Sequence, residues 1–399
     1  MLHKLKTIVF ISGAWPDRSK GYSIANLATL DFFSNRIEQC IYLGPSDDYV
    51  NQNIQKDYKR VDFVPSGFER KPKSIRFVKS LFSKYPAITE RFWKDFSRVE
   101  SEISIRCKFE ESETLFFYED IPSAYLIFYL KKRFPGAKHF VRSHNVVYKG
   151  FSGLSKSQGL IKKIAWNIEL KKIKKFEKKV FGTADKFYAI SNEDASIYRE
   201  DLDIIPDGIV DFFIDVNRYR SIGAAQNNII YLGSADLRKA QALQKFIQES
   251  WPIIQSKNAK TKLLLAGRNT EQFHNPPNRV YGYGFIESEI EFLQKGSVFI
   301  NPQLSGAGIK IKSLIALAAS KLLVTTKIGA EGTGIENGVH CVIENNFYKQ
   351  AEIINSFLQK KENYFELIQA GRDYVFNNFK KEHFYKKMYE LFDSNKFKN

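Results

Sequence analysis

A short glycine- and lysine-rich segment of the 399-residue chain has the residues to bind a phosphate group. Gly306 and Gly308 lie in a turn after an apolar run at 298–301, and Lys310 and Lys312 follow where helical spacing of apolar residues begins. A glycine turn leading into a helix presents backbone N–H groups and the positive end of the helix dipole. Lysines oppose that dipole, so their position there favours a bound anion. Two solvated lysines in an ordinary crossover would give the same pattern.

The elements that must position this segment are short apolar runs separated by stretches with helical periodicity. Such alternation predicts parallel sheets covered by helices on both faces. The fold class is therefore predicted to be α/β, with two Rossmann-like, doubly wound domains facing each other across a cleft. The predicted strands are residues 7–12, 41–43, 62–64, 114–118, 139–143, 187–190, 204–205, 229–232, 262–266, 280–283, 298–301, 322–326 and 341–343.

The alternation breaks at residues 207–226, where Asp-Gly after a proline is followed by irregular aromatic and then small residues. This break predicts a linker between a first domain at 1–206 and a second domain at 227–379. The segment 380–399 is aromatic and basic at helical spacing. It either caps the second domain or packs back on the first.

Composition limits the classes of protein to consider. Lys plus Arg number 61 and Asp plus Glu 44, and the net charge of +17 attracts polyanions such as nucleotide phosphates or anionic lipid. No apolar run approaches the ~18 residues of a spanning helix. Cys40, Cys107 and Cys341 are widely spaced without a CxxC pair, which excludes a disulfide framework and a thiolate zinc site. We therefore expect a cytoplasmic protein.

Residues 160–180 hold eight lysines, two glutamates and an apolar stripe at helical spacing. Two interpretations stay open: a solvated helix face, or a helix whose lysines between Lys162 and Lys179 rest on an anionic membrane, such as the inner face of the plasma membrane. A second basic patch lies at 70–79. Nucleic acid is not an expected partner, because no recognised module appears and the basic segment lacks interleaved surface aromatics.

Several further motifs occur in a fixed order along nearly the whole chain. They are the turn at 12–23 with Gly13 and Gly21, Arg142-Ser143-His144-Asn145, ADKFYAIS at 184–191, IPDGI at 205–209, YLG at 231–233, WP at 251–252, LAG at 265–267, GAGIKIK at 306–312 and GAEG at 329–332. In this order they resemble the family 4 (group 1) retaining glycosyltransferases of the GT-B fold. The resemblance is to the branch with R-x-H-N and G-x-G-x-K-x-K motifs.

The resemblance implies metal-independent transfer of a sugar (a hexosyltransferase-like activity) from a nucleotide-sugar donor to a hydroxyl, with retention and without a cofactor. The acceptor would be a glycan, a lipid-linked sugar or a protein, as in polysaccharide biosynthesis. The first domain would bind the acceptor and the second the donor. The implied catalytic residues are His144 and Glu331. The donor-binding candidates are Gly306, Gly308, Lys310, Lys312, Gly233, Lys239 and Gly332, and those on the acceptor or pyrophosphate side are Gly13, Gly21, Arg142, Asn145 and Glu119.

One departure from the family pattern affects these assignments. The family usually carries two glutamates eight positions apart around the donor helix, where this chain has Ala307 and Ile315. A hydrophobic side chain cannot accept hydrogen bonds from ribose hydroxyls. Either donor recognition is rerouted, through Glu331 or backbone groups, or catalysis has been lost. The second case would make the chain a catalytically impaired GT-B paralogue that binds glycans or assists another glycosyltransferase.

Overall fold

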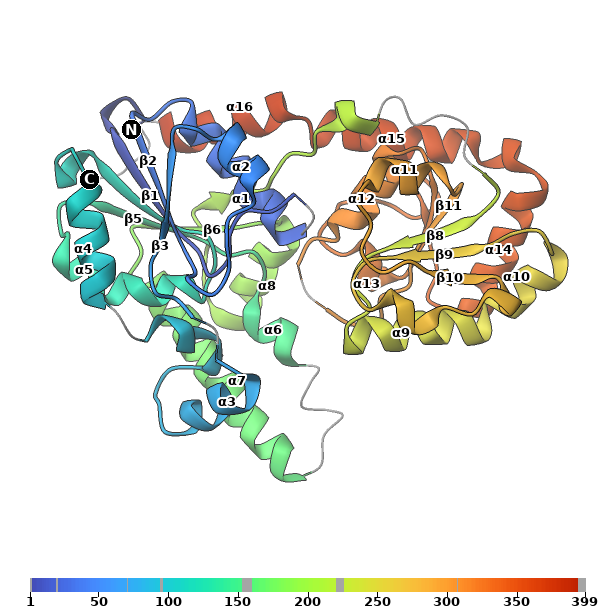
Figure 1. Cartoon of the computed structure of the whole chain (residues 1–399), viewed down its shortest axis with the longest axis horizontal. Coiled ribbons are helices and arrows are strands. Elements are labelled where there is room, and N and C mark those ends of the chain that lie inside the picture. Colours follow the sequence, from blue (N-terminus) through green and yellow to red (C-terminus); the bar gives the residue numbers. More distant parts are fainter. Residues whose placement is uncertain are drawn as a thin grey trace. The chain divides into compact units, whose positions relative to one another are not determined.

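The computed structural model describes residues 2–18, 21–69, 71–93, 96–152, 160–219, 226–306 and 308–393. The chain forms two compact domains: Met1–Phe213 together with Phe384–Asn399, and Ile214–His383. Each is a parallel sheet with helices on both faces (Figure 1). The predicted α/β class with two doubly wound domains is confirmed.

The first domain has a seven-stranded sheet in the order β3-β2-β1-β4-β5-β6-β7. Every residue of its central strands β1 and β4 is buried, which is why both are continuous apolar runs in the sequence. The strands are β1 (Thr7–Ile11), β2 (Gln39–Gly44), β3 (Val61–Pro65), β4 (Thr114–Tyr118), β5 (Lys138–Arg142), β6 (Lys186–Ala189) and β7 (Gly208–Ile209). The flanking helices are α1 (Gly21–Ser34), α2 (Gln52–Asp57), α3 (Lys73–Leu81), α4 (Phe96–Arg106), α5 (Ile127–Arg133), α6 (Val147–Ser152), α7 (Leu160–Phe181) and α8 (Asn192–Leu202).

The last strand of this sheet lies further along the chain than predicted. Residues 204–205 form no strand, and β7 pairs with β6 instead. Asp203 ends α8 in the left-handed region at φ 54°, and the Ile204 N–H donates to Tyr198 O at 3.0 Å. These residues complete a helix end. The predicted strand was wrong because the buried Ile204 belongs to the contact that closes this helix.

The second domain has a six-stranded sheet in the order β10-β9-β8-β11-β12-β13. Its strands are β8 (Ile229–Leu232), β9 (Leu263–Ala266), β10 (Val280–Gly282), β11 (Val298–Asn301), β12 (Leu322–Thr325) and β13 (Val342–Ile343), all paired in parallel. Its helices are α9 (Leu237–Glu249), α10 (Trp251–Lys257), α11 (Glu289–Gln294), α12 (Ile311–Ala318), α13 (Lys327–Ala330), α14 (Phe347–Gln359) and α15 (Phe365–Asn378).

Helix α16 (Lys381–Asp393) follows the second domain in the chain and packs on the first. Tyr385 Oη donates to Asp31 Oδ2 at 2.5 Å, and Arg36 Nε donates to Tyr389 Oη at 2.7 Å. The chain thus crosses back to its first domain, which is one of the two arrangements that the sequence left open. In the described part of the chain, no helix is both long enough and apolar enough to cross a membrane.

Candidate functional site

The glycine turn of the second domain leads from β11 into α12. Gly306 and Gly308 have φ of +136° and +77°, a region that side chains disfavour, so these positions need glycine. Lys310 is the residue that precedes the helix, and Lys312 lies in its first turn. The sequence placed both lysines in the first turn, so Lys310 sits one step earlier than predicted. Ala307 lies outside the described residues.

Lys310 is fixed within the loop rather than extended from it. Its side chain is only 6% exposed. Lys310 Nζ donates to Gly308 O at 2.5 Å and lies 3.2 Å from Glu331 Oε2. Glu331 directly follows α13. The next residue, Gly332, has φ +77°, and a Cβ on it would lie 2.9 Å from Ile309 Cα, so the two segments are closely packed. The structure therefore brings the glycine turn, Lys310, Glu331 and Gly332 into one compact loop cluster.

Lys312 forms a second ion pair, with a carboxylate that the sequence did not single out. Lys312 Nζ lies 2.7 Å from Glu289 Oε2, and Tyr219 Oη donates to Glu289 Oε1 at 2.8 Å. Burial alone would raise the pKa of the Glu289 carboxyl, but the charge and hydrogen bond of Lys312, with the Tyr219 hydroxyl, outweigh it and lower the pKa. Glu289 is therefore an ionised acceptor beside α12.

Lys239 joins the same group of cations from α9. Burial lowers the pKa of Lys239, and repulsion from Lys310, Lys312 and Arg268 lowers it further, against the attraction of Asp236. This coupling means that the lysines of α9 and α12 lie within electrostatic reach of one another. Lys239 lies on the helix after β8, and Lys310 and Lys312 lie at the start of the helix after β11. Because β8 and β11 are neighbouring parallel strands, all three lysines are on the side of the sheet where open α/β sheets bind ligands.

Gly233 is placed by packing between strand ends. It follows β8, and its N–H donates to Ala266 O at 2.8 Å. Gly267 follows β9 with φ +118°, and a Cβ on it would collide with the Gly233 carbonyl. The two glycines let the loops after β8 and β9 approach closely. Ile315 faces inward from α12 and is 1% exposed, so it belongs to the core of this domain.

A buried ion pair lies at the carboxyl ends of β4 and β5 in the first domain. Glu119 follows β4, Arg142 ends β5, and both side chains are fully buried. The Arg142 guanidinium donates to the Glu119 carboxylate and, at 3.3 Å, to Asp211 O. Thr29 Oγ1 donates to Glu119 Oε1 at 2.5 Å. The sequence placed both charged groups against the acceptor or pyrophosphate; their burial corrects this to a supporting position beneath the surface.

His144 extends from this pair toward the surface. Its Nε2 lies 3.5 Å from Glu119 Oε2, and its side chain is 13% exposed. Burial and the neighbouring Arg142 charge lower the pKa of His144, and the Glu119 carboxylate offsets this only in part. The imidazole is therefore neutral near pH 7. If Nε2 carries the proton donated to Glu119, Nδ1 is left as an acceptor.

The remaining predicted residues of the first domain lie in neighbouring turns. The Gly13 carbonyl accepts a hydrogen bond from Arg91, and a Cβ on Gly13 would lie 3.2 Å from Arg91 Nη1. Gly21 begins α1. The Asn145 carbonyl accepts from Ser143 Oγ at 2.5 Å, which anchors the turn after His144. Arg91 was missed, since it comes from a segment distant in sequence.

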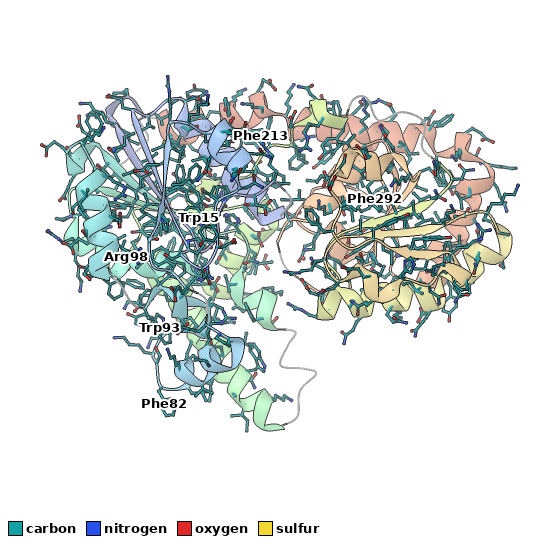
Figure 2. The ribbon with its side chains drawn as sticks, viewed as in Figure 1. Trp15, Phe82, Trp93, Arg98, Phe213 and Phe292 are labelled. Atoms are coloured by element: carbon teal, nitrogen blue, oxygen red, sulfur yellow. The ribbon has the colours of Figure 1, made fainter. Side chains whose placement is uncertain are left out.

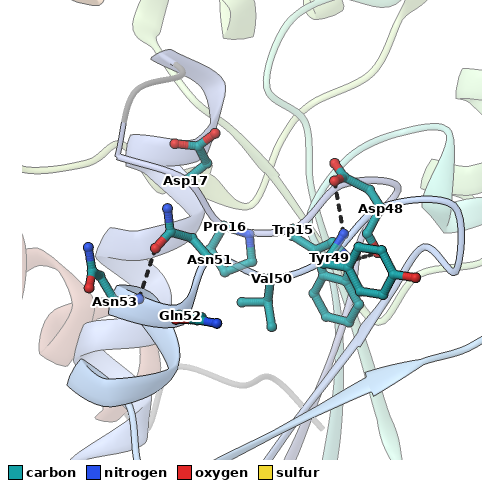
Figure 3. Close-up of a pocket in the computed structure, with 9 residues that line it drawn as sticks. All are labelled: Trp15, Pro16, Asp17, Asp48, Tyr49, Val50, Asn51, Gln52 and Asn53. Atoms are coloured by element: carbon teal, nitrogen blue, oxygen red, sulfur yellow. Dashed lines mark hydrogen bonds between the residues drawn. The ribbon is translucent and has the colours of Figure 1, made fainter. Parts of the chain in front are cut away.

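A polar pocket of about 500 Å³ opens at the carboxyl ends of β1 and β2 (Figure 3). Trp15 closes one side, with its Nε1 donating to Asp48 O at 2.9 Å, whereas the Tyr49 ring is 88% exposed. Gly44 makes room, since a Cβ there would lie 2.5 Å from the Trp15 ring. The rest of the polar lining consists of the carboxylate and amide residues Asp17, Asp48, Asn51, Gln52 and Asn53. Apart from the adjacent Gly13, no sequence motif pointed to this pocket, because its lining comes from two separate loops, at residues 15–17 and 48–53.

Among the residues that the structure describes, no three His, Cys, Asp or Glu side chains lie together in a way that could hold a metal ion. The charged groups of the second-domain cluster are instead lysines paired with single carboxylates.

Comparisons with known proteins bear on both domains. Residues 226–360 match the family model of group 1 glycosyl transferases. Sucrose-phosphate synthase from Thermosynechococcus elongatus superposes with a TM-score of 0.70 at 14% identity, over 97% of this chain and 98% of that one. HepE of Anabaena, solved with UDP and glucose, superposes with a TM-score of 0.63 at 11% identity, over 98% of this chain and all of that one.

The fold is GT-B. Within this GT-B chain, the matched segment contains Lys239, Lys310, Lys312 and Glu331. A curated relative from Klebsiella pneumoniae, described as an uncharacterized 44.6 kDa protein in the cps region, is 27% identical over 274 residues. That alignment covers 64% of this chain and 67% of the relative.

Proposed function

We propose that the protein is a metal-independent, retaining glycosyltransferase that moves a sugar from a nucleotide-sugar donor to a hydroxyl of a glycan, lipid-linked or protein acceptor. The observation that carries this proposal is the glycine turn with Lys310 and Lys312 at the start of α12, beside the strand that leads to Lys239, within the segment that matches group 1 glycosyl transferases. Further support comes from HepE, which has the same fold and was solved with UDP and glucose.

The lysine cluster provides what departure of a nucleoside diphosphate requires. When the bond between the sugar and the diphosphate breaks, negative charge accumulates on the phosphate oxygens and must be stabilised. Lys310 is already held by Gly308 and Glu331, so little conformational freedom is lost when it meets an anion. Lys310 and Lys312, although each is paired with one carboxylate, and Lys239 offer amino groups to the phosphates where a metal ion would otherwise bind them, and this supports the metal independence that we propose.

Carboxylates beside these lysines can take over the acceptor role that Ile315 lacks. Glu289 is ionised and held by Lys312 and Tyr219, so its oxygens have a fixed orientation. Glu331 is held in the same way by Lys310. Carboxylate oxygens accept hydrogen bonds from hydroxyl groups. We assign Glu289 to ribose hydroxyls and Glu331 to the donor sugar.

In the first domain, His144 and the polar pocket are our candidates for binding sugar hydroxyls. A neutral imidazole held by Glu119 can accept a hydrogen bond from a sugar hydroxyl at Nδ1. The pocket combines the exposed ring of Tyr49 with carboxylates and amides, a lining suited to a hydroxyl-rich acceptor. Glu119 and Arg142 act through His144 as positioning residues.

A thermal-shift panel of UDP-, GDP- and other nucleotide sugars tests the donor class. A ligand that binds only the folded chain raises its melting temperature by mass action. At least one nucleotide sugar should raise it, and the same donor should be turned over when glycan and lipid-linked acceptors are supplied. A panel without any stabilising nucleotide sugar would contradict the proposal. The alternative of a catalytically impaired paralogue is not favoured by the comparisons.

A further inference from the structure

The first domain carries an exposed apolar face on α3 and the residue after it. Ile75, Val78, Leu81 and Phe82 are all exposed, with Phe82 at 90% and Val78 at 55%. Ile75, Val78 and Phe82 recur at intervals of three and four residues, so they line one side of the helix. Figure 2 shows Phe82 at the far end of this part of the domain, pointing away from the sheet.

Helix α7 adds two apolar side chains next to this face. Ile164 and Ile168 are 62% and 45% exposed and lie one turn apart. Lys172 lies one turn beyond Ile168 and donates to the carbonyl of Ser80 on α3, so this side of α7 faces α3. Figure 1 shows the two helices side by side, projecting from the sheet. We define the α3–α7 surface as Ile75, Val78, Leu81, Phe82, Ile164 and Ile168.

The two glutamates of α7 are withdrawn from the exterior. Glu169 is 3% exposed and accepts hydrogen bonds from the Ala87 N–H and, at 3.2 Å, from Ser80 Oγ. Glu177 is fully buried and accepts from the Val147 N–H at 2.8 Å, at the start of α6. Each glutamate satisfies backbone groups of another element. The exposed side of α7 therefore presents lysines without neighbouring carboxylates of its own helix.

Positive charge lies beside the apolar patch, on α7. Lys163, Lys171 and Lys175 are exposed on α7. Residues 70–89 contain six lysines and arginines and no acidic residue. Within the described part of this stretch, Lys79 is paired with the buried Glu90 at 3.2 Å and Lys71 with the exposed Glu69 at 3.6 Å. An apolar patch with a cationic border matches an anionic bilayer, in which acyl chains lie beneath phosphate groups.

We propose that the α3–α7 surface docks the protein on an anionic lipid bilayer. Phe82 and its apolar neighbours enter the acyl region, and the lysines of α7 contact lipid phosphates. The sequence pointed only to α7 as a membrane contact; the structure adds α3 as the apolar part of the surface. This inference concerns where the chain binds and does not depend on sugar transfer.

Vesicle flotation of the full chain tests the docking surface. The vesicles are phosphatidylcholine alone or phosphatidylcholine mixed with phosphatidylglycerol. Binding is expected only with phosphatidylglycerol and should weaken as salt rises. The variant V78S/F82S should lower the vesicle affinity at least about tenfold, because two apolar side chains no longer leave water. Ile105→Ser is the matched control, since Ile105 is 76% exposed on α4 outside this surface, and it should leave binding unchanged.

Charge reversal provides the second comparison. K171E/K175E on α7 should lower affinity for phosphatidylglycerol vesicles at least about tenfold, since each basic residue near an anionic surface contributes attraction. K260E/K349E, at exposed positions of the second domain, changes net charge equally and should have little effect. Absence of binding to phosphatidylglycerol vesicles overturns the proposal, as does equal loss in test and control variants. Binding of RNA by the protein, without binding to vesicles, would also overturn the proposal. The vesicle assays contain no nucleotide-sugar donor, so their results do not depend on whether the protein transfers a sugar.

Discussion

Lys310 and Glu331 are bound to each other through both side chain and backbone. Lys310 Nζ lies 3.2 Å from Glu331 Oε2, and the Lys310 N–H donates to Glu331 O at 3.3 Å. The pairing fixes a cation at the start of α12, and it also places a carboxylate where a phosphate would compete for the same amino group. At the donor site that we propose, Glu331 would therefore have two opposing effects: it positions Lys310 and partly neutralises its charge.

Replacing Glu331 by Gln separates these effects. The amide keeps a hydrogen-bond acceptor for Lys310 but removes the competing charge, so the affinity for the nucleoside diphosphate should be maintained or increased. The transfer rate should fall about tenfold or more, because we assign the carboxylate to the donor sugar. Calorimetry and turnover measure the two effects. Glu336→Gln, at an exposed position nearby, should change neither. A large loss of diphosphate affinity in E331Q would contradict competition by the carboxylate.

Gly332 and Gly338 allow a matched test of the loop after α13, which packs against the glycine turn and Lys310. Both have left-handed φ, +77° and +74°, but a Cβ at Gly332 would lie 2.9 Å from Ile309 Cα, whereas Gly338 has open space. Alanine at either position should cost about 1–2 kcal/mol in backbone strain. Only G332A should also weaken nucleotide binding, since it displaces the turn before Lys310. Equal nucleotide affinity in both variants would show that the Gly332 contact is not required.

The buried pair of Glu119 and Arg142 should dominate local stability in the first domain. Removing either partner leaves an uncompensated buried charge, and Glu119→Gln or Arg142→Met should cost about 3–5 kcal/mol. In a double-mutant cycle the two changes together should cost less than their sum. Urea denaturation measures these free energies. Asp57→Asn breaks the exposed pair with Arg18 and should cost at most about 1 kcal/mol. Additive losses at 119 and 142 would disprove their coupling.

The buried His139 should make the folded state less stable as the pH falls. Burial lowers the pKa of His139 to about 4, against the hydrogen bond with Phe134 O, which raises it. The unfolded chain protonates this histidine near its ordinary pKa of about 6.5. Stability from this site is therefore present above about pH 6.5 and is lost as pH falls toward 4, by about 3 kcal/mol in all.

Denaturation across that pH range tests the effect. His139→Gln should flatten the acid side of the stability profile, whereas His274→Gln, at an exposed position, should retain the wild-type slope. The same slope in wild type and H139Q would assign acid sensitivity to other groups.

Much of the fold follows from the sequence because the strands are buried on both sides. β4 and β11 were predicted with their observed bounds, since each is a continuous apolar run closed by polar or turn residues. Residues 204–205 gave the same signal but belong to a helix end, which only tertiary packing distinguishes. The glycine turn and its lysines could also be recognised from the sequence, because all their residues are adjacent in the chain.

The carboxylates that pair with those lysines were harder to predict from the sequence. Glu289 reaches Lys312 from a helix 23 residues earlier in the chain. Glu331 was identified as a family motif, but not as the ion-pair partner of Lys310. Trp15 and Tyr49 line one pocket from two different loops, which local sequence patterns could not predict. Burial also changed the expected role of Arg142, because a basic residue after a strand gives no sign of facing a buried carboxylate.

The most direct test of the central claim is the affinity of Lys310→Ala for the nucleotide sugar that most stabilises the wild type, measured by calorimetry. Loss of a charged hydrogen-bond donor to the diphosphate should weaken binding about 10- to 100-fold. Lys349→Ala, at an exposed position on α14, should bind as the wild type does. A folded K310A that binds the donor with wild-type affinity would contradict a diphosphate site at the start of α12.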